Sequence, residues 1–177
     1  MNTYSVEQSR IIHFFTASTM SAPLWLLVRL YLGYEWFIAG WEKVINPVWF
    51  GPSAGAAVQG FVKGALTKTT GLHPDVSMWY ASFLQNMVLP NATAWSNAVA
   101  VGEVLVGLGL IVGLFTGIAA FFGFVMNMSY LLAGTVSMNP VMLFLALLLM
   151  AAWRVAGYWG LDRFAQPMIR RKFFRLT

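Results

Sequence analysis

Charged residues are scarce in this sequence of 177 residues: they make up 10% of the chain, whereas hydrophobic residues make up 59%. A soluble domain usually contains about 25% charged residues. The composition therefore excludes an ordinary soluble domain and indicates a membrane protein that crosses the bilayer several times. At this length we predict one membrane domain, residues 1–177, without a separate soluble module.

Cysteine is absent, and the only two histidines are His13 and His73. The absence of cysteine excludes disulfides, thiol redox chemistry and cysteine-ligated iron–sulfur or zinc sites. The two histidines are predicted to lie on opposite sides of the membrane, which excludes a haem held by both. No haem, flavin or metal motif is evident, so we predict no metal site.

The N-terminus also lacks the basic region and the cleavage site of a signal peptide, and we expect a retained cytoplasmic lead-in. Basic residues are concentrated at the other end, where five of the eleven fall in the last fifteen positions. A basic tail directly after a membrane span marks the cytoplasmic side rather than a nucleic-acid site. Nucleic acid is therefore not a predicted partner.

Four apolar stretches are long enough to cross a bilayer, which takes about 20 helical residues. The second and third are separated only by Gly113–Gly117, where glycine allows a helix to end in a left-handed conformation. Short connections make successive helices antiparallel neighbours. The predicted fold is therefore all-α, an integral membrane four-helix bundle with spans at residues 23–41, 96–114, 116–134 and 140–159.

An even number of spans places both termini on one side, and the basic tail, residues 160–177, makes that side cytoplasmic. Residues 42–95 then form a long outer loop. Asp75 is predicted to cap an amphipathic helix in this loop, either a surface anchor or a lid over a site. Its apolar positions follow helical spacing: Val76, Trp79, Tyr80, Phe83, Leu84, Met87 and Val88.

Polar residues inside the predicted spans point to a common site. A charged residue at the centre of a bilayer costs about 2.5–3.5 kcal/mol on insertion scales, so it is expected to face partners within the bundle. Counting from the outer helix ends, Glu35, Glu103 and Asn127 each lie about 10 Å deep. One face of the first span is predicted to point inward, and it carries Arg29, Gly33, Trp36, Gly40 and Lys43.

We expect Arg29 and Glu35 to meet Glu103 inside the bundle. Two buried carboxylates cannot both pair with one arginine, and a carboxylate without its own cation tends to bind a proton. Glu103 is therefore predicted to take part in proton-coupled chemistry, with Trp36 stacking on a ring-shaped ligand and Tyr130 offering its hydroxyl to the same layer. The alternative is an ion pair that only fixes the helix register.

Several segments together resemble the DoxX/DoxD family of four-helix membrane proteins, in particular the quinone-reducing thiosulfate dehydrogenase subunits. They are RLYLGYEWFIAGWEKVINP, GEVLVGLGLIVGLFTG, NMSYLLAGTVSMNP and WRVAGYWGLDR, and they extend from about Pro23 to Arg163. The long outer loop is the part that matches least. Family positions matched here are Arg29, Gly33, Glu35, Gly40, Lys43, Pro47, Glu103, Gly107, Asn127, Gly134 and Asn139.

The resemblance implies a subunit that passes electrons from thiosulfate to membrane quinone, as a thiosulfate:quinone oxidoreductase does. Glu103 would then supply protons to a quinone held between the first three spans. Thiosulfate is a dianion, and its cationic partners would be Lys43, Lys63 and Lys68. The predicted catalytic residues are Glu103, Glu35 and Arg29. The predicted quinone-binding residues are Trp36, Lys43, Asn127, Tyr130 and Asn139.

Two other functions remain open: a non-catalytic membrane scaffold that docks a soluble redox or sulfur-transfer enzyme, and a small proton-coupled carrier. A scaffold should tolerate neutralisation of Glu35 and Glu103, whereas the other two should not. The predicted location is a prokaryotic cell membrane. Expected partners are the lipid bilayer, quinone, a second subunit or soluble redox protein, and another copy of the chain.

Overall fold

The computed structural model describes residues 9–173 of the chain, with side chains up to residue 168. Helices account for 78% of the protein, and no strand occurs among the described residues. The predicted all-α class is therefore confirmed. Helices and helical turns follow one another as α1 (Arg10–Ala17), η1 (Thr19–Ser21), α2 (Ala22–Val44), α3 (Ala56–Leu66), η2 (Thr67–Thr69), α4 (Met78–Phe83), η3 (Leu84–Val88), η4 (Leu89–Asn91), α5 (Ala92–Val112), α6 (Thr116–Leu132), α7 (Asn139–Ala151), α8 (Trp153–Ala156) and α9 (Asp162–Phe173).

The helix ends follow from local chemistry. Proline lies in the first turn of α2 and of α7, where its missing N–H leaves no helical bond unmade. Gly113 ends α5 in a left-handed conformation, with φ of 69°. Its N–H donates to the Gly109 carbonyl over 2.9 Å, and α6 begins three residues later. The predicted hairpin between the second and third spans is confirmed.

The lengths of the helices only partly match the predicted spans. Among the described residues, one helix, Met78–Val112, is long and apolar enough to cross a membrane by itself. Arg10–Ala17 and Thr19–Val44 pass the same test together, with a bend of 66° between them. Helices α6 and α7 are apolar but have 17 and 13 residues, fewer than the roughly 20 that a straight crossing takes. The four-span arrangement therefore remains a prediction.

The last predicted span, residues 140–159, is divided. Helix α7 ends at Ala151 and α8 extends only from Trp153 to Ala156. The chain then turns so that the N–H of Leu161 and that of Asp162 donate to the carbonyls of Val112 and Gly113, over 3.2 and 2.8 Å. The residues directly after the predicted span therefore bond to the end of α5, at the α5–α6 hairpin.

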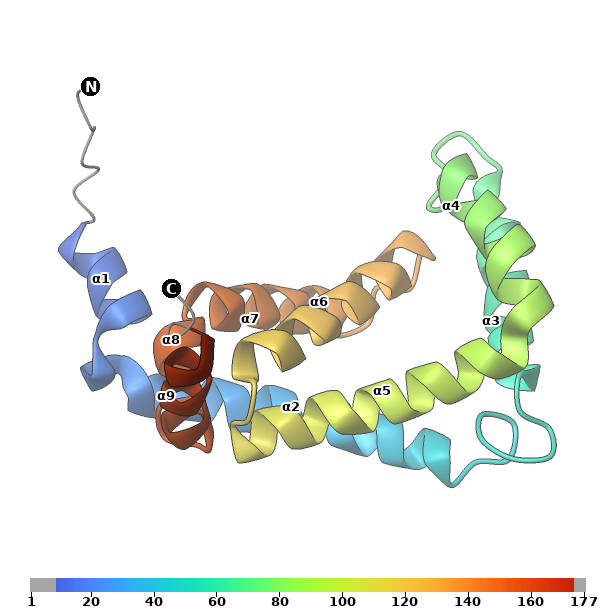
Figure 1. Ribbon diagram of the computed structural model, residues 1–177. Coiled ribbons are helices and arrows are strands. Elements are labelled where there is room, and N and C mark those ends of the chain that lie inside the picture. The colour runs from blue at the N-terminus through green and yellow to red at the C-terminus, as the bar shows by residue number, and fades with distance from the viewer. Residues whose placement is uncertain (1–8, 174–177) are drawn as a thin grey trace.

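Residues 42–95 are mostly helical rather than a loop with one amphipathic helix. Helix α3 was not predicted, and the predicted helix begins at Met78, after Ser77, rather than at an Asp75 cap. It continues through the π-helical turn η3 and Pro90 into α5. Figure 1 shows α3 and α4 together at one end of the molecule, and α1, α8 and α9 at the other.

A second core explains why these segments are helical. Residues at spacings of four on α4 and η3 are buried against α3 and the start of α5. The predicted apolar face is therefore only partly buried, because Trp79 and Met87 are exposed. The Tyr80 hydroxyl donates to the Ser129 carbonyl over 2.8 Å. This bond connects the α3–α4 end to α6. The second core consists of Val58, Val62, Ala65, Val76, Tyr80, Ala81, Leu84, Val88, Ala92 and Ala133.

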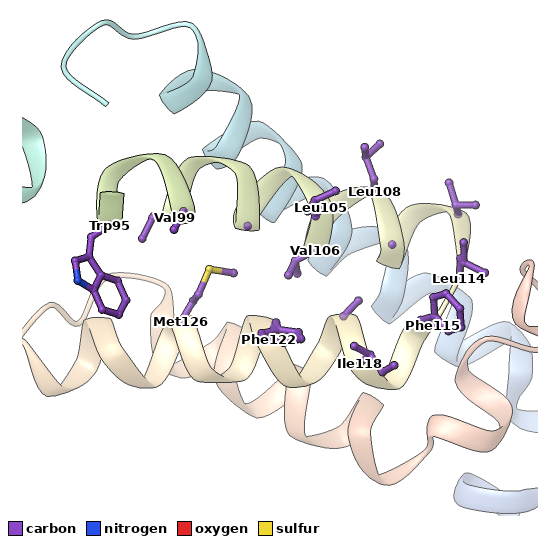
Figure 2. Close-up of a pocket in the computed structure, with 15 residues that line it drawn as sticks. Trp95, Val99, Leu105, Val106, Leu108, Leu114, Phe115, Ile118, Phe122 and Met126 are labelled. Atoms are coloured by element: carbon purple, nitrogen blue, oxygen red, sulfur yellow. The ribbon is translucent and has the colours of Figure 1, made fainter. Parts of the chain in front are cut away.

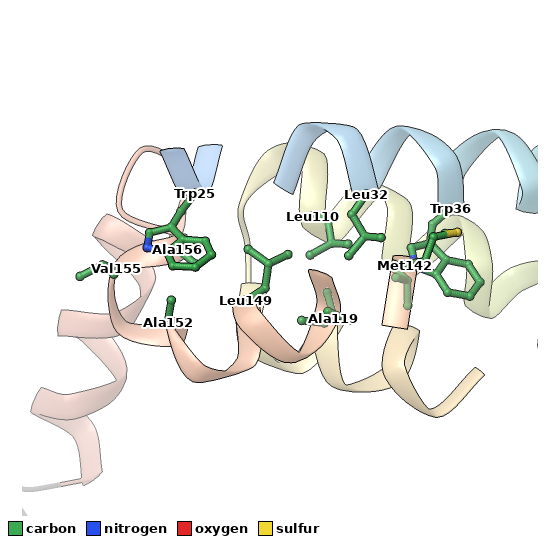
Figure 3. Close-up of a cluster of buried hydrophobic side chains, with 13 residues drawn as sticks. Trp25, Leu32, Trp36, Leu110, Ala119, Met142, Leu149, Ala152, Val155 and Ala156 are labelled. Carbon is green, nitrogen blue, oxygen red and sulfur yellow. The ribbon is translucent and has the colours of Figure 1, made fainter. Parts of the chain in front are cut away.

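The main core lies where α2, α5, α6 and α7 meet. Figure 3 shows Leu32 and Trp36 of α2 facing Leu110 of α5, with Leu149 of α7 beside them. Glycines let α2 and α5 approach closely: a Cβ at Gly40 would lie 2.5 Å from the Val104 nitrogen, and one at Gly107 would lie 2.5 Å from the Phe37 nitrogen. These contacts fix the register of the two helices.

Arg29 is buried, as predicted, but its partner is not Glu103. Its Nη2 donates to the Trp159 carbonyl over 3.1 Å at the α8–α9 end. A Cβ at Gly113 or at Gly160 would overlap the guanidinium, so a side chain at either position would displace the Arg29 side chain. The carboxylate nearby is Asp162, which accepts bonds from the N–H groups of Phe115 and Thr116, over 2.7 and 2.9 Å. It was missed because its capping role spans 46 residues of sequence.

Asp162→Ala should lower the stability of the purified protein. The carboxylate is the cap of α6, and removing a capping side chain typically costs about 0.5–2 kcal/mol. The exposed Asp75 provides the control, because a surface substitution is expected to change stability by about 0.5 kcal/mol or less. Thermal unfolding in detergent of Asp162→Ala and Asp75→Ala measures both. Equal midpoints for the two variants would contradict the capping role.

Candidate functional site

A buried network of three side chains joins α2, α5 and α6. Lys43 Nζ lies 2.7 Å from Glu103 Oε2, and the Tyr130 hydroxyl donates to Glu103 Oε1 over 2.7 Å. The Glu103 side chain is 1% exposed and that of Lys43 is 19% exposed. Each carboxylate oxygen therefore has its own donor, and the ammonium connects the buried carboxylate to the surface.

Lys43 is held from three directions. Besides Glu103, its Nζ donates to the Ala39 carbonyl over 3.3 Å and lies 5.2 Å from the centre of the Trp49 ring. A cation over the face of an indole is attracted by the ring quadrupole. Trp49 was not predicted to belong to the site. The one sequence feature that could have indicated it is its position two residues after Pro47, which matches the family.

The network corrects the predicted pairing of charges. Glu103 was expected to lack its own cation, but Lys43 is that cation. Lys43 was correctly predicted on the inward face of the first span with Gly40 and Trp36, yet it was expected to bind thiosulfate or quinone rather than Glu103. Lys43 lies in the last turn of α2, about one turn after Gly40, and Gly40 packs on the Glu103 backbone. The Lys43 side chain therefore reaches the carboxylate.

Two further buried polar groups lie near the network without a partner. Asn127 is 0% exposed and Trp36 is 1% exposed. Among the described residues, neither amide atom of Asn127 nor the Trp36 Nε1 has a hydrogen-bond partner. A buried donor or acceptor left unsatisfied costs about 1–3 kcal/mol. These groups are therefore positioned to bind a polar atom that the protein itself does not supply.

Contacts between the helices place Glu103 and Asn127 at one level. Gly102 of α5 faces the Met126 sulfur of α6. The next residue on each helix, Glu103 and Asn127, therefore lies at a similar position along the bundle axis. The Trp36 indole lies against Gly123, one turn along α6 from Asn127. The predicted layer therefore contains Glu103 and Asn127 as expected.

Glu35 lies outside this layer. It precedes Gly40, which marks the Glu103 level on α2, by five residues, or about 7.5 Å along the helix. Its side chain is half-buried, beside the inward face rather than on it. The expected meeting of Arg29, Glu35 and Glu103 is wrong: α2 extends further than the predicted span, and this lengthening brings Lys43 to Glu103 instead.

The remaining predicted ligands lie elsewhere. Asn139 begins α7 and donates to the Thr135 carbonyl over 3.0 Å, which stabilises the α6–α7 turn. Lys68 donates to the Gly134 carbonyl over 2.7 Å, whereas Lys63 is exposed on α3. Within residues 9–168, no group of three or more His, Asp or Glu side chains is arranged to hold a metal ion. Lys63 and Lys68 are therefore separate cations, away from the Glu103 network.

The fold and this site define a helical protein of membrane type with a charged pair in its interior. A family model agrees with this class: the DoxX model matches residues 24–136, so the chain belongs to the DoxX family. Members of this family are typically membrane-associated, and the match includes all three network residues. No curated protein and no solved structure matches the chain.

A double-mutant cycle tests whether Lys43 and Glu103 form a pair that stabilises the fold. Lys43→Met leaves the Glu103 carboxylate buried without its cation, and breaking a buried pair typically costs about 3–5 kcal/mol. The double variant Lys43→Met with Glu103→Gln removes both charges and should regain much of that loss. Unfolding in detergent measures the cycle. Additive losses would show that the two groups are not coupled.

Proposed function

We propose that this protein is the membrane subunit of a quinone-coupled oxidoreductase, with thiosulfate as the electron donor. The observation that carries the proposal is the Lys43–Glu103–Tyr130 network beside the unpartnered amide of Asn127. A quinone ring needs an apolar slot, donors for its carbonyl oxygens and a source of protons. The network supplies protons, and Asn127 and Trp36 supply free donors.

The proposed reaction balances with two thiosulfates for each quinone. Each thiosulfate gives up one electron, a sulfur–sulfur bond forms between them, and tetrathionate results. The quinone takes up both electrons and two protons and becomes the quinol. The electrons pass directly between the substrates or through a partner subunit, and the exposed Lys63 is the cation available to the dianion at the surface.

The geometry suggests how protons would reach the ring. The Tyr130 hydroxyl gives its proton to a quinone oxygen. The phenolate then regains a proton from Lys43 through Glu103, because Tyr130 and Lys43 each form a hydrogen bond of 2.7 Å with the Glu103 carboxylate. The partly exposed Lys43 ammonium is then recharged from water at the surface. Tyr130, rather than Glu103, is the immediate donor in this scheme, because Glu103 is already paired with a cation.

Tyr130→Phe and Glu103→Gln should each lower thiosulfate-dependent quinone reduction by the purified protein, by about 10²–10⁴-fold, the usual contribution of general acid–base catalysis. Tyr34→Phe is the matched control, because the same hydroxyl is lost from an exposed tyrosine of α2. Folding of each variant is checked by its unfolding temperature. Wild-type turnover in a folded Tyr130→Phe protein would remove the phenol from the mechanism.

A scaffold function has one observation in its favour. Helix α1 exposes Ile11 and Ile12, and α9 exposes Phe164 and Met168, at the same end of the molecule. Such surfaces suit docking on a membrane or on a soluble enzyme. A scaffold would retain its binding to a soluble partner in Glu103→Gln, which separates it from the oxidoreductase.

We further propose several membrane spans with both termini cytoplasmic and the α3–α4 end outside. The chain has no cysteine, so single cysteines report accessibility directly. In intact cells, a membrane-impermeant maleimide should label Lys63→Cys and spare Arg163→Cys, both of which replace exposed residues. Lysis should make both reactive. Labelling of Arg163→Cys alone before lysis would reverse the proposed orientation. Labelling of both variants before lysis would place the two ends on the same side of the membrane.

A further inference from the structure

An apolar groove of about 770 Å³ lies between α5 and α6. Figure 2 shows Trp95 and Met126 near one end of it, and Leu114 and Phe115 near the other. Every side chain that lines it is aliphatic, aromatic or a thioether. Its volume falls in the range of about 300–1,000 Å³ that is typical of small-molecule sites.

Gly102 keeps the groove open beside Met126, toward the Trp95 end. A Cβ at Gly102 would meet only the Met126 sulfur, at 3.7 Å, which is an ordinary contact. Gly40 and Gly107 differ, because a Cβ at either would lie within 3 Å of the partner helix. Helix packing therefore explains those two glycines but not Gly102, whose missing side chain adds space to the groove.

The shape of the groove favours a chain over a ring. It extends along α5 from Trp95 to Val112, which is about 26 Å of helix. The hydrocarbon core of a bilayer is about 30 Å thick. An occupant that fills the groove is therefore long, apolar and parallel to the helices, and its polar part lies beyond one end.

One end of the groove lies at the level of the buried network, although the network residues themselves do not line it. Gly102 precedes Glu103, and Met126 is one helical turn from Tyr130. The cation at this end, Lys43, is already neutralised by Glu103, so a phosphate would meet a carboxylate rather than a free positive charge. A neutral ring is compatible with this end, whereas the headgroup of a phospholipid is not.

We propose that the groove binds the isoprenoid tail of the quinone whose ring lies at Glu103 and Tyr130. The proposal rests on the proposed function, because it takes the quinone as the ligand of that site. It adds that α5 and α6 determine the affinity for the tail, independently of the groups that transfer protons.

The test is photolabelling of the purified full-length protein in nanodiscs with a long-tailed quinone that carries a diazirine in its tail. Mass spectrometry should place the label between Leu105 and Phe122. Gly102→Leu, which fills the groove, should lower this labelling about tenfold. Gly60→Leu is the matched control, because Gly60 is exposed on α3 with no atom near its Cβ position, and its labelling should equal that of the wild type.

Ala98→Leu narrows the groove from an exposed position and serves as a second variant if Gly102→Leu does not fold. Unlabelled long-tailed quinone should compete with the probe, and a phospholipid in excess should not. Label spread evenly over the lipid-facing helices, or displaced by phospholipid, would overturn the proposal.

A ring-free isoprenoid alcohol with the same diazirine separates this proposal from the proposed function. Weaker labelling by this probe than by the quinone is expected if the ring binds at the network. Groove labelling by both probes without any thiosulfate-dependent turnover would retain the tail site and overturn the thiosulfate reaction. Turnover without labelling of α5 and α6 would overturn the tail site alone.

Discussion

The structure depends above all on the need to neutralise Glu103. A carboxylate that is 1% exposed cannot remain charged without donors, because desolvation of an isolated ion costs several kcal/mol. Lys43 satisfies one oxygen and Tyr130 the other. This requirement fixes where α2 ends relative to α5, and it explains why Gly40 must lie directly against the Glu103 backbone.

A second charged junction stabilises the opposite end. Arg29 holds the turn after α8 through the Trp159 carbonyl, and Asp162 caps α6. Between the two junctions the core is apolar, with Leu32 and Leu110 completely buried. The charges thus lie at two levels of the bundle, where they set the helix register, and the apolar core between them separates the two sets.

The sequence allowed the helix faces to be predicted better than the partners. Spacing alone identified the inward face that carries Arg29, Trp36 and Lys43, because that pattern depends only on helix geometry. The pair between Lys43 and Glu103 depends on where α2 ends and on how 60 intervening residues fold, which periodicity does not encode. Helix α3 was missed for a similar reason: Gly60, Lys63 and Gly64 weaken its pattern, and burial against α4 and α5 stabilises it.

If the network served only to fix the helix register, the ion pair between Lys43 and Glu103 would be sufficient. Tyr130 adds a donor to a carboxylate that already has a cation, and Asn127 places a complete amide in the interior without a partner. Unsatisfied buried polar groups are costly, and they persist where function requires them. The polar groups at the Glu103 level, near a groove whose lining is almost entirely apolar, match a ligand with a polar ring and an apolar chain. The Arg29 junction also has buried atoms without a partner, Arg29 Nε and Nη1 and Thr116 Oγ1, so the Glu103 level is distinguished by its ion pair and its phenol rather than by unsatisfied groups alone.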